Sequence, residues 1–240
     1  MRTVIWGANG AMGQLLQKAL GQEVSGLVSL DGENGVARNA RELPDLKPEA
    51  VIDFSHHSSV AEVTAYAISQ GCPLVIGTTG HTEEEQALIY AAAEKIPVFY
   101  SHNMSLGIAV LCRIAKEAAA CFPEADIEIL EIHHNRKVDA PSGTAHMLFK
   151  ALQEVRPEAV KVCGRAGEGK RQKKEIGIAS LRMGNVVGVH EVHICTPSQT
   201  LTLRHEAANR GMFADGAVEA ARFLQGKAPG LYTMQDFLER

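Results

Sequence analysis

Short apolar runs alternate with helical segments along the first hundred residues of the chain. The runs typical of strands span residues 3–6, 24–30, 50–54, 73–76 and 97–100. The segments with apolar residues at helical spacing lie between them and span 12–20, 58–70 and 82–95. Near-continuous apolar strands separated by helices predict a parallel sheet that is covered on both faces. The sequence therefore predicts an α/β fold with an N-terminal Rossmann-like, doubly wound domain.

The pattern changes after residue 105. Helical segments at 106–121 and 142–154 flank a strand at 126–133, and three strand candidates then follow one another without helices, at 175–182, 186–195 and 200–205. Successive strands predict a mixed or antiparallel open sheet in a second, α+β domain. A last helix over 211–225 is expected to return to the first domain. We therefore expect one domain from 1–105 with 210–240 and another from 106–209.

Composition narrows the function. The 240 residues carry 24 Lys and Arg against 28 Asp and Glu, a formal charge of −4, whereas a duplex-binding protein carries a basic excess. The five cysteines are scattered and form no C-x-x-C pair, which fits a reducing cytoplasm rather than a disulfide framework. No apolar run approaches the ~18 residues that span a bilayer, and no signal core precedes the first strand. We expect a cytoplasmic protein that binds neither nucleic acid nor membrane.

A glycine-rich turn joins the first strand to the first helix. Its residues are Gly7, Ala8, Asn9, Gly10, Ala11, Met12 and Gly13. In this context glycines permit a tight turn and close backbone approach, while the helix start receives a pyrophosphate. The spacing is G-x-x-G-x-x-G, with Asn9 where the usual pattern has its second glycine. A dinucleotide site is favoured, and a tight turn without a ligand is the alternative.

The acidic residue that binds ribose hydroxyls should end the second strand, where Asp31 is the candidate. No Arg or Lys adjoins it along the chain to bind a 2′-phosphate. We therefore expect NADH to be used at least comparably with NADPH, although the sequence determines this choice only weakly. The polar connection over 31–48 predicts an irregular loop.

Two further loops follow predicted parallel strands, at the end of the sheet where α/β proteins bind ligands. Small and hydrogen-bonding residues there are expected to line a nicotinamide site, although each loop alone is only a turn. They are Gly77, Thr78 and Thr79 after the fourth strand, and Ser101, His102, Asn103 and Met104 after the fifth.

The segment 131–145 combines proton donors with a helix start. His133, His134 and Lys137 precede Ser142, Gly143 and Thr144. A helix start binds anions, and His with Lys supplies proton donors of different pKa. The segment thus favours carboxylate binding with general acid catalysis; a solvated basic loop before a capped helix is the alternative.

Two other clusters of polar residues give weaker evidence for a functional site. His190, His193, Cys195 and His205 are metal-ligating types, but strand alternation sends His190 and His193 to opposite faces, so we expect no metal site. The basic stretch over 164–174 lacks interleaved aromatics, and we expect a mobile loop near the substrate entrance rather than a nucleic-acid arm.

Segment 131–145 resembles the signature of the dihydrodipicolinate reductase family. The likeness extends over nearly the whole chain, through residues 7–13, 75–80, 103–105, 175–177, 182–184 and 213–217. The resemblance implies NAD(P)H-dependent reduction of 4-hydroxy-tetrahydrodipicolinate, or dihydrodipicolinate, to tetrahydrodipicolinate in lysine and diaminopimelate biosynthesis.

The same resemblance implies residue roles. His133 is the catalytic acid/base and Lys137 a proton donor, while His134, Gly143 and Thr144 contact the substrate carboxylates. Residues 7–12, 77–79 and 101–104 contact NADH or NADPH. The domain 1–105 with 210–240 is then the dinucleotide-binding domain, and 106–209 binds the small dicarboxylate and forms a homotetramer through its sheet.

Two alternatives belong to other classes. A non-catalytic dinucleotide-sensing module would bind the cofactor but have no use for the His-His-x-x-Lys cluster. Another two-domain reductase of amino-acid metabolism, such as an aspartate-semialdehyde dehydrogenase, would need a nucleophilic cysteine.

Overall fold

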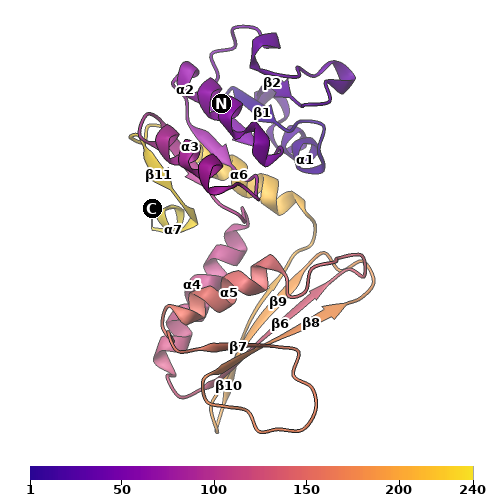
Figure 1. The fold of residues 1–240 in the computed structure, drawn as a ribbon, viewed down its shortest axis with the longest axis vertical. Coiled ribbons are helices and arrows are strands. Elements are labelled where there is room, and N and C mark those ends of the chain that lie inside the picture. The colour runs from indigo at the N-terminus through magenta and orange to yellow at the C-terminus, as the bar shows by residue number, and fades with distance from the viewer. Residues whose placement is uncertain (240) are drawn as a thin grey trace. The chain divides into compact units, whose positions relative to one another are not determined.

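The computed structural model describes residues 1–239, which divide into two compact units. One unit consists of Met1–Ser105 with the segment from Arg210 onward, and the other is Leu106–Asn209. In Figure 1 the first unit is indigo to magenta and returns in yellow, and the second is pink to orange. Each unit has its own sheet. Within the described residues, no helix is both long and apolar enough to span a membrane.

The first unit contains a parallel sheet of six strands in the order β11-β5-β4-β3-β1-β2. Its strands are β1 (Thr3–Trp6), β2 (Val24–Val28), β3 (Ala50–Asp53), β4 (Leu74–Ile76), β5 (Pro97–Tyr100) and β11 (Gly230–Tyr232). Its helices are α1 (Ala11–Leu20), α2 (Val60–Gln70), α3 (Glu83–Ala93), α6 (Gly211–Phe223) and α7 (Met234–Leu238). The predicted Rossmann-like fold is confirmed.

Both faces of this sheet are apolar, because alternate residues of each strand point to opposite sides. Val4 and Trp6 of β1 share a buried cluster with Val63 of α2 and Ile89 of α3. On the other face, Phe99 of β5 meets Phe223 of α6 edge-to-face, with ring centroids 6.3 Å apart. Helices therefore cover both faces.

The second unit has a mixed five-stranded sheet in the order β10-β9-β6-β8-β7, with β6, β8 and β7 parallel and β9 antiparallel to its neighbours β6 and β10. Its elements are α4 (Leu106–Cys121), β6 (Asp126–His133), α5 (Gly143–Gln153), β7 (Val160–Cys163), β8 (Glu175–Arg182), β9 (Val189–Cys195) and β10 (Thr200–Glu206). The second sheet is thus mixed, as the succession of strands predicted.

One face of this second sheet forms the core of the unit. Ile127 and Ile129 of β6 pack with Val192 of β9 against α4 and α5. Residues between them in sequence, such as Glu128 and Glu191, point to the opposite face, which no helix of this unit's described residues covers.

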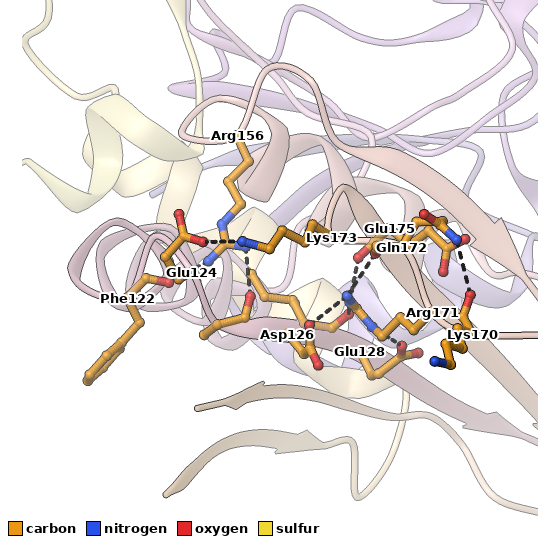
Figure 2. Close-up of polar contacts among 12 residues, drawn as sticks. Phe122, Glu124, Asp126, Glu128, Arg156, Lys170, Arg171, Gln172, Lys173 and Glu175 are labelled. Carbon is orange, nitrogen blue, oxygen red and sulfur yellow. Dashed lines mark hydrogen bonds and ion pairs between the residues drawn. The ribbon is translucent and has the colours of Figure 1, made fainter. Parts of the chain in front are cut away.

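The sequence pattern predicted no strand between 154 and 175, but β7 lies directly before the basic stretch over 164–174. The Arg171 guanidinium also anchors the end of the stretch (Figure 2). It donates to Asp126 Oδ1 at 2.7 Å, to Ile127 O at 3.0 Å and to Glu175 O at 2.5 Å. Arg171 therefore ties the segment to the starts of β6 and β8.

Candidate active site

The glycine turn after β1 contains glycines of two kinds. Gly7 has a φ of +83°, and a Cβ there would lie 2.3 Å from the Phe54 carbonyl oxygen. A Cβ at Gly13 would lie 2.2 Å from the Gly7 carbonyl oxygen. A Cβ at Gly10 would meet only that same oxygen, at 3.2 Å. Gly7 and Gly13 are therefore required by packing within the chain, whereas the outer side of Gly10 is open.

The start of α1 lacks a capping side chain. Gly10 is its N-cap residue, and the N–H groups of Ala11, Met12 and Gly13 have no hydrogen-bond acceptor within residues 1–239. The starts of α3 and α5, by contrast, are capped by Thr82 and Ser142. Unpaired N–H groups at the positive end of a helix dipole suit an anion. The turn therefore fits a dinucleotide pyrophosphate.

The three loops predicted to contact the cofactor follow β1, β4 and β5, whose carboxyl ends share one edge of the sheet. The strand order reverses beside β1, the position where such sheets bind ligands. Thr78 Oγ1 accepts a hydrogen bond from the Ser55 N–H at 2.9 Å, which joins the loops after β3 and β4. Ala8 and Met104 are buried as whole residues, so the structure does not expose these two predicted cofactor contacts.

Asp31 lies beside the glycine turn. Asn9 Nδ2 donates to Asp31 Oδ1 at 2.6 Å, and the Glu33 N–H donates to the same oxygen at 3.2 Å. These hydrogen bonds lower the pKa of Asp31. Asn9, which replaces the usual second glycine, thus fixes the acidic residue where ribose hydroxyls are bound in this class of fold.

No basic residue adjoins Asp31 along the chain, but the loop that follows brings Arg38 against the next residue, Gly32. The 31–48 loop is irregular, as expected, with 3₁₀ turns at Glu33–Gly35 and Ala40–Glu42. It returns Arg38 onto Gly32, where an added Cβ would lie 2.4 Å from the Arg38 Nε. Arg38 thus lies against the residue that follows Asp31, and only the turn-forming residues of the loop could have signalled this return.

His133 ends β6, and Lys137 follows in the next loop. His133 Nδ1 lies 2.5 Å from Glu131 Oε2, while its Nε2 has no partner in the described chain. The pKa of His133 is lowered overall, mainly by burial. Glu131 opposes this shift, and the charges of Lys137 and Arg182 add to it. Lys137 Nζ pairs with Asp139 at 2.7 Å and remains partly exposed. The structure thus leaves the Nε2 of His133 unpaired within reach of the charge of Lys137.

The start of α5 follows the same loop. Ser142 caps the helix by accepting from the Ala145 N–H at 3.2 Å. Gly143 is exposed, and no atom lies within 4 Å of the place where its Cβ would stand. His134 Nδ1 is buried without a partner in residues 1–239. The helix start is therefore accessible to an anion, with Thr144 in its first turn.

Sequence reasoning assigned no role to three residues around His133, the buried Glu131 and His190 and the partly buried Arg182. Glu131 is completely buried, and although burial opposes its ionisation, hydrogen bonds from Arg182 and His133 lower its pKa to about 2. His190 Nε2 lies 3.1 Å from Ser142 Oγ, and burial followed by the charge of His133 lowers the pKa of His190 to about 4. These residues come from three strands, and no local pattern marks them. Within 1–239 no cluster of three His, Cys, Asp or Glu residues could hold a metal ion.

A parallel sheet with an uncapped glycine turn, together with a histidine and a lysine at an accessible helix start, defines the class of two-domain nicotinamide-dependent reductases. The family description "Dihydrodipicolinate reductase, N-terminus" matches residues 1–104, and "Dihydrodipicolinate reductase, C-terminus" matches 107–238. The chain belongs to the dihydrodipicolinate reductase family.

Individual relatives agree with this assignment. The chain is 41% identical over 244 residues to the 4-hydroxy-tetrahydrodipicolinate reductase of Alkaliphilus metalliredigens, covering 99% of each chain. It is 43% identical to that of Akkermansia muciniphila, covering 98% of this chain and 96% of the relative. A dipicolinate-bound dihydrodipicolinate reductase from Paenisporosarcina sp. TG-14 superimposes with a TM-score of 0.80 at 26% identity, covering 99% of both chains.

Proposed function

We propose that this protein is an NAD(P)H-dependent 4-hydroxy-tetrahydrodipicolinate reductase, which forms tetrahydrodipicolinate in lysine and diaminopimelate biosynthesis. The observation that carries the proposal is the His133 pair with Glu131 next to the accessible start of α5. This places proton transfer and carboxylate binding at one corner of the second unit. The family membership of the whole chain supports the choice of substrate.

The first unit is proposed to bind the cofactor. The N–H groups at the start of α1 hold the pyrophosphate, and Asp31 with Arg38 faces the adenosine ribose. Thr78, Thr79 and the loop over 101–104 are assigned to the nicotinamide end. When bound, the nicotinamide supplies the hydride.

The second unit is proposed to bind the dicarboxylate substrate. The N–H of Gly143 and the Thr144 hydroxyl hold one carboxylate, and His134 contributes from the loop. Hydride addition to the conjugated imine develops negative charge, which requires a proton and nearby positive charge. His133 Nε2 exchanges the proton, while Lys137 both attracts the dianion and donates a proton.

Assembly and location form the finer part of the proposal. We assign a homotetramer formed through the uncovered face of the second unit's sheet, which carries the charged side chains of Glu128 and Glu191 and the exposed Leu181. A cytoplasmic location is supported by five free cysteines. The net charge of −4 supports a small-molecule partner rather than nucleic acid.

The deciding experiment supplies the product of dihydrodipicolinate synthase and follows NAD(P)H absorbance. Oxidation that depends on this product is expected. Cofactor binding without oxidation would indicate a sensing module instead. A thiolate-dependent aspartate-semialdehyde dehydrogenase is disfavoured, because burial raises the pKa of Cys72 to about 12 and of Cys112 to about 11.

A further inference from the structure

We propose that Glu131 is the positioning residue of the reaction, holding His133 with Nε2 free and fixing the start of α5 at the same time. This inference rests on the proposed function and deepens it. Glu131 touches neither substrate nor cofactor in the proposed site, so it acts through His133 and Ser142.

The hydrogen bonds of Glu131 link three elements. Its Oε2 lies 2.5 Å from His133 Nδ1 and accepts from Arg182 Nη1 at 2.9 Å. Its Oε1 accepts from Arg182 Nη2 at 2.7 Å and from the Ser142 N–H at 3.1 Å. Arg182 Nη2 also donates to the Asp139 carbonyl oxygen at 2.6 Å. Each carboxylate oxygen is therefore held twice, and the group cannot turn without breaking bonds to β8 or α5.

The position of Glu131 explains its burial. It occupies the core-facing side of β6 in register with Ile127 and Ile129, and its side chain is 0% exposed. A carboxylate at such a position is costly unless it is paired and hydrogen-bonded. An apolar residue would complete the core but could not bond His133 or the α5 start. The pairing with Arg182 is what permits a charge there.

An ionised carboxylate accepts hydrogen bonds only, so its partner His133 Nδ1 must carry the proton. The neutral ring then exposes a lone pair on Nε2, and the protonated ring exposes an N–H there. The charged and titratable groups around the ring are Glu131 on β6, Arg182 on β8, His190 on β9 and Lys137 in the loop. Among these only Glu131 is negative, so it alone stabilises the imidazolium.

The second sheet contains a similar triad that serves as a matched control. Glu191 accepts a hydrogen bond from Arg204, and its Oε2 lies 3.0 Å from His193 Nε2. These contacts parallel those of Glu131 with Arg182 and with His133 Nδ1. This Glu-x-His pair lies on the neighbouring strand β9 but on the opposite, uncovered face. Its histidine is not adjacent to a helix start or to Lys137.

The wild-type protein gives the first test, by ¹⁵N NMR of histidine-labelled enzyme without substrate. We expect neutral His133 to carry its proton on Nδ1, with a downfield Nδ1 proton signal from the short contact to Glu131. A neutral ring with its proton on Nε2 would overturn the proposal. This measurement needs neither a variant nor turnover.

Glu131→Gln gives the second test. The amide oxygen still accepts from Ser142 and Arg182 Nη2, but the NH₂ group now faces His133 Nδ1 and Arg182 Nη1. The substitution loses the second Arg182 hydrogen bond and drives the neutral ring to the Nε2–H form. We expect kcat to fall by about 10²–10³-fold and the pKa of His133 to fall by about one to three pH units. KM and NAD(P)H affinity should change less than threefold, on the order of half a kcal/mol. A kcat within threefold of wild type would refute the positioning role.

Two further variants separate positioning from general damage. Glu131→Asp keeps the charge, so it should retain the Nδ1–H form and recover at least tenfold of the kcat lost in Glu131→Gln. Glu191→Gln breaks the control triad and should leave kcat within twofold of wild type. Equal losses in Glu131→Gln and Glu191→Gln would overturn the proposal. If the wild type shows no turnover, the reductase assignment fails, while the His133 tautomer still decides the positioning role.

Discussion

Arg38 and Asp31 show how two single residues can govern the choice of cofactor. Asp31 is fixed by Asn9 beside the glycine turn, and Arg38 lies against Gly32 on the next residue. A carboxylate suits free ribose hydroxyls, and a guanidinium suits a 2′-phosphate. Because both stand at one end of the cofactor site, we infer that the protein uses NADH and NADPH.

Arg38→Ala should therefore weaken the binding of NADPH but not that of NADH. A lost charge-assisted contact costs about 1.5–3 kcal/mol, which is on the order of 10- to 100-fold in Kd. NADH affinity should stay within about twofold, and Arg41→Ala, in the same loop, should change neither. Calorimetric titration with both cofactors measures this, and an equal loss for NADH and NADPH would exclude the 2′-phosphate role.

His133→Ala and Lys137→Ala test the two proton donors. Each should lower kcat by roughly 10²–10⁴-fold with NAD(P)H affinity intact, since both act on the transition state. The double variant should be far from additive, because the two groups serve one proton transfer. Values of kcat within a few-fold of wild type in both single variants would mean that the loop is only structural.

The starts of helices mark the two proposed binding sites. α3 closes its start with the capping box of Thr82 and Glu85. α1 leaves its first N–H groups unpaired, and α5 uses Ser142 as a cap but begins with an exposed glycine. The uncapped start suits a pyrophosphate, and the partly capped one suits a single carboxylate.

Gly10→Val should abolish cofactor binding while the fold persists. A Cβ at Gly10 meets only the Gly7 carbonyl oxygen, at 3.2 Å, so a small shift of that carbonyl accommodates valine in the protein, while the branched side chain blocks a pyrophosphate. Gly13→Val is the contrasting variant. Its Cβ would collide with the backbone of Gly7 and Ala8, so this substitution should unfold the first unit. Calorimetric titration and thermal melting distinguish the two; unchanged NADH affinity in Gly10→Val would place the pyrophosphate elsewhere.

Thr144→Val should weaken carboxylate binding at the start of α5. It removes the hydroxyl and keeps the shape of the side chain. We therefore expect KM and the Ki of pyridine-2,6-dicarboxylate to rise, which corresponds to a loss of about 1–3 kcal/mol in binding free energy. Thr200→Val, an exposed threonine in the same unit, should have no effect. Unaltered inhibition of Thr144→Val would move the anion site away from α5.

At the scale of the whole molecule, periodicity predicted the elements that bury a regular face. It missed β7 and the three-residue β11, because both strands are short and residues 160–163 of β7 are largely exposed, so neither buries a regular face. Likewise, motifs indicated His133 and Lys137, whose signals lie within one segment. Glu131, Arg182 and His190 form a network only after three strands pair, so no local signal could assemble it.

The buried carboxyls Asp53 and Glu131 should contribute to stability with opposite dependence on pH. Burial raises the pKa of Asp53 in the first unit from 3.8 to about 6, so its folded form binds a proton that the unfolded chain lacks. The stability it contributes is present below about pH 4 and is lost as the pH rises through 6. Glu131 in the second unit has its pKa lowered from 4.5 to about 2, so its contribution is lost as the pH falls from 4.5 toward 2.

Calorimetric unfolding of Asp53→Asn, Glu131→Gln and the wild type between pH 3 and 8 measures these contributions. Relative to wild type, Asp53→Asn should gain about 3 kcal/mol between pH 4 and 6, because the asparagine keeps the hydrogen bond from Ser55 without a charge to bury. Glu131→Gln should have a lower free energy of unfolding than wild type at neutral pH. This difference should shrink only below about pH 4.5, by a similar amount as the pH falls toward 2. Parallel pH profiles for both variants would show that neither buried carboxyl controls the stability of its unit.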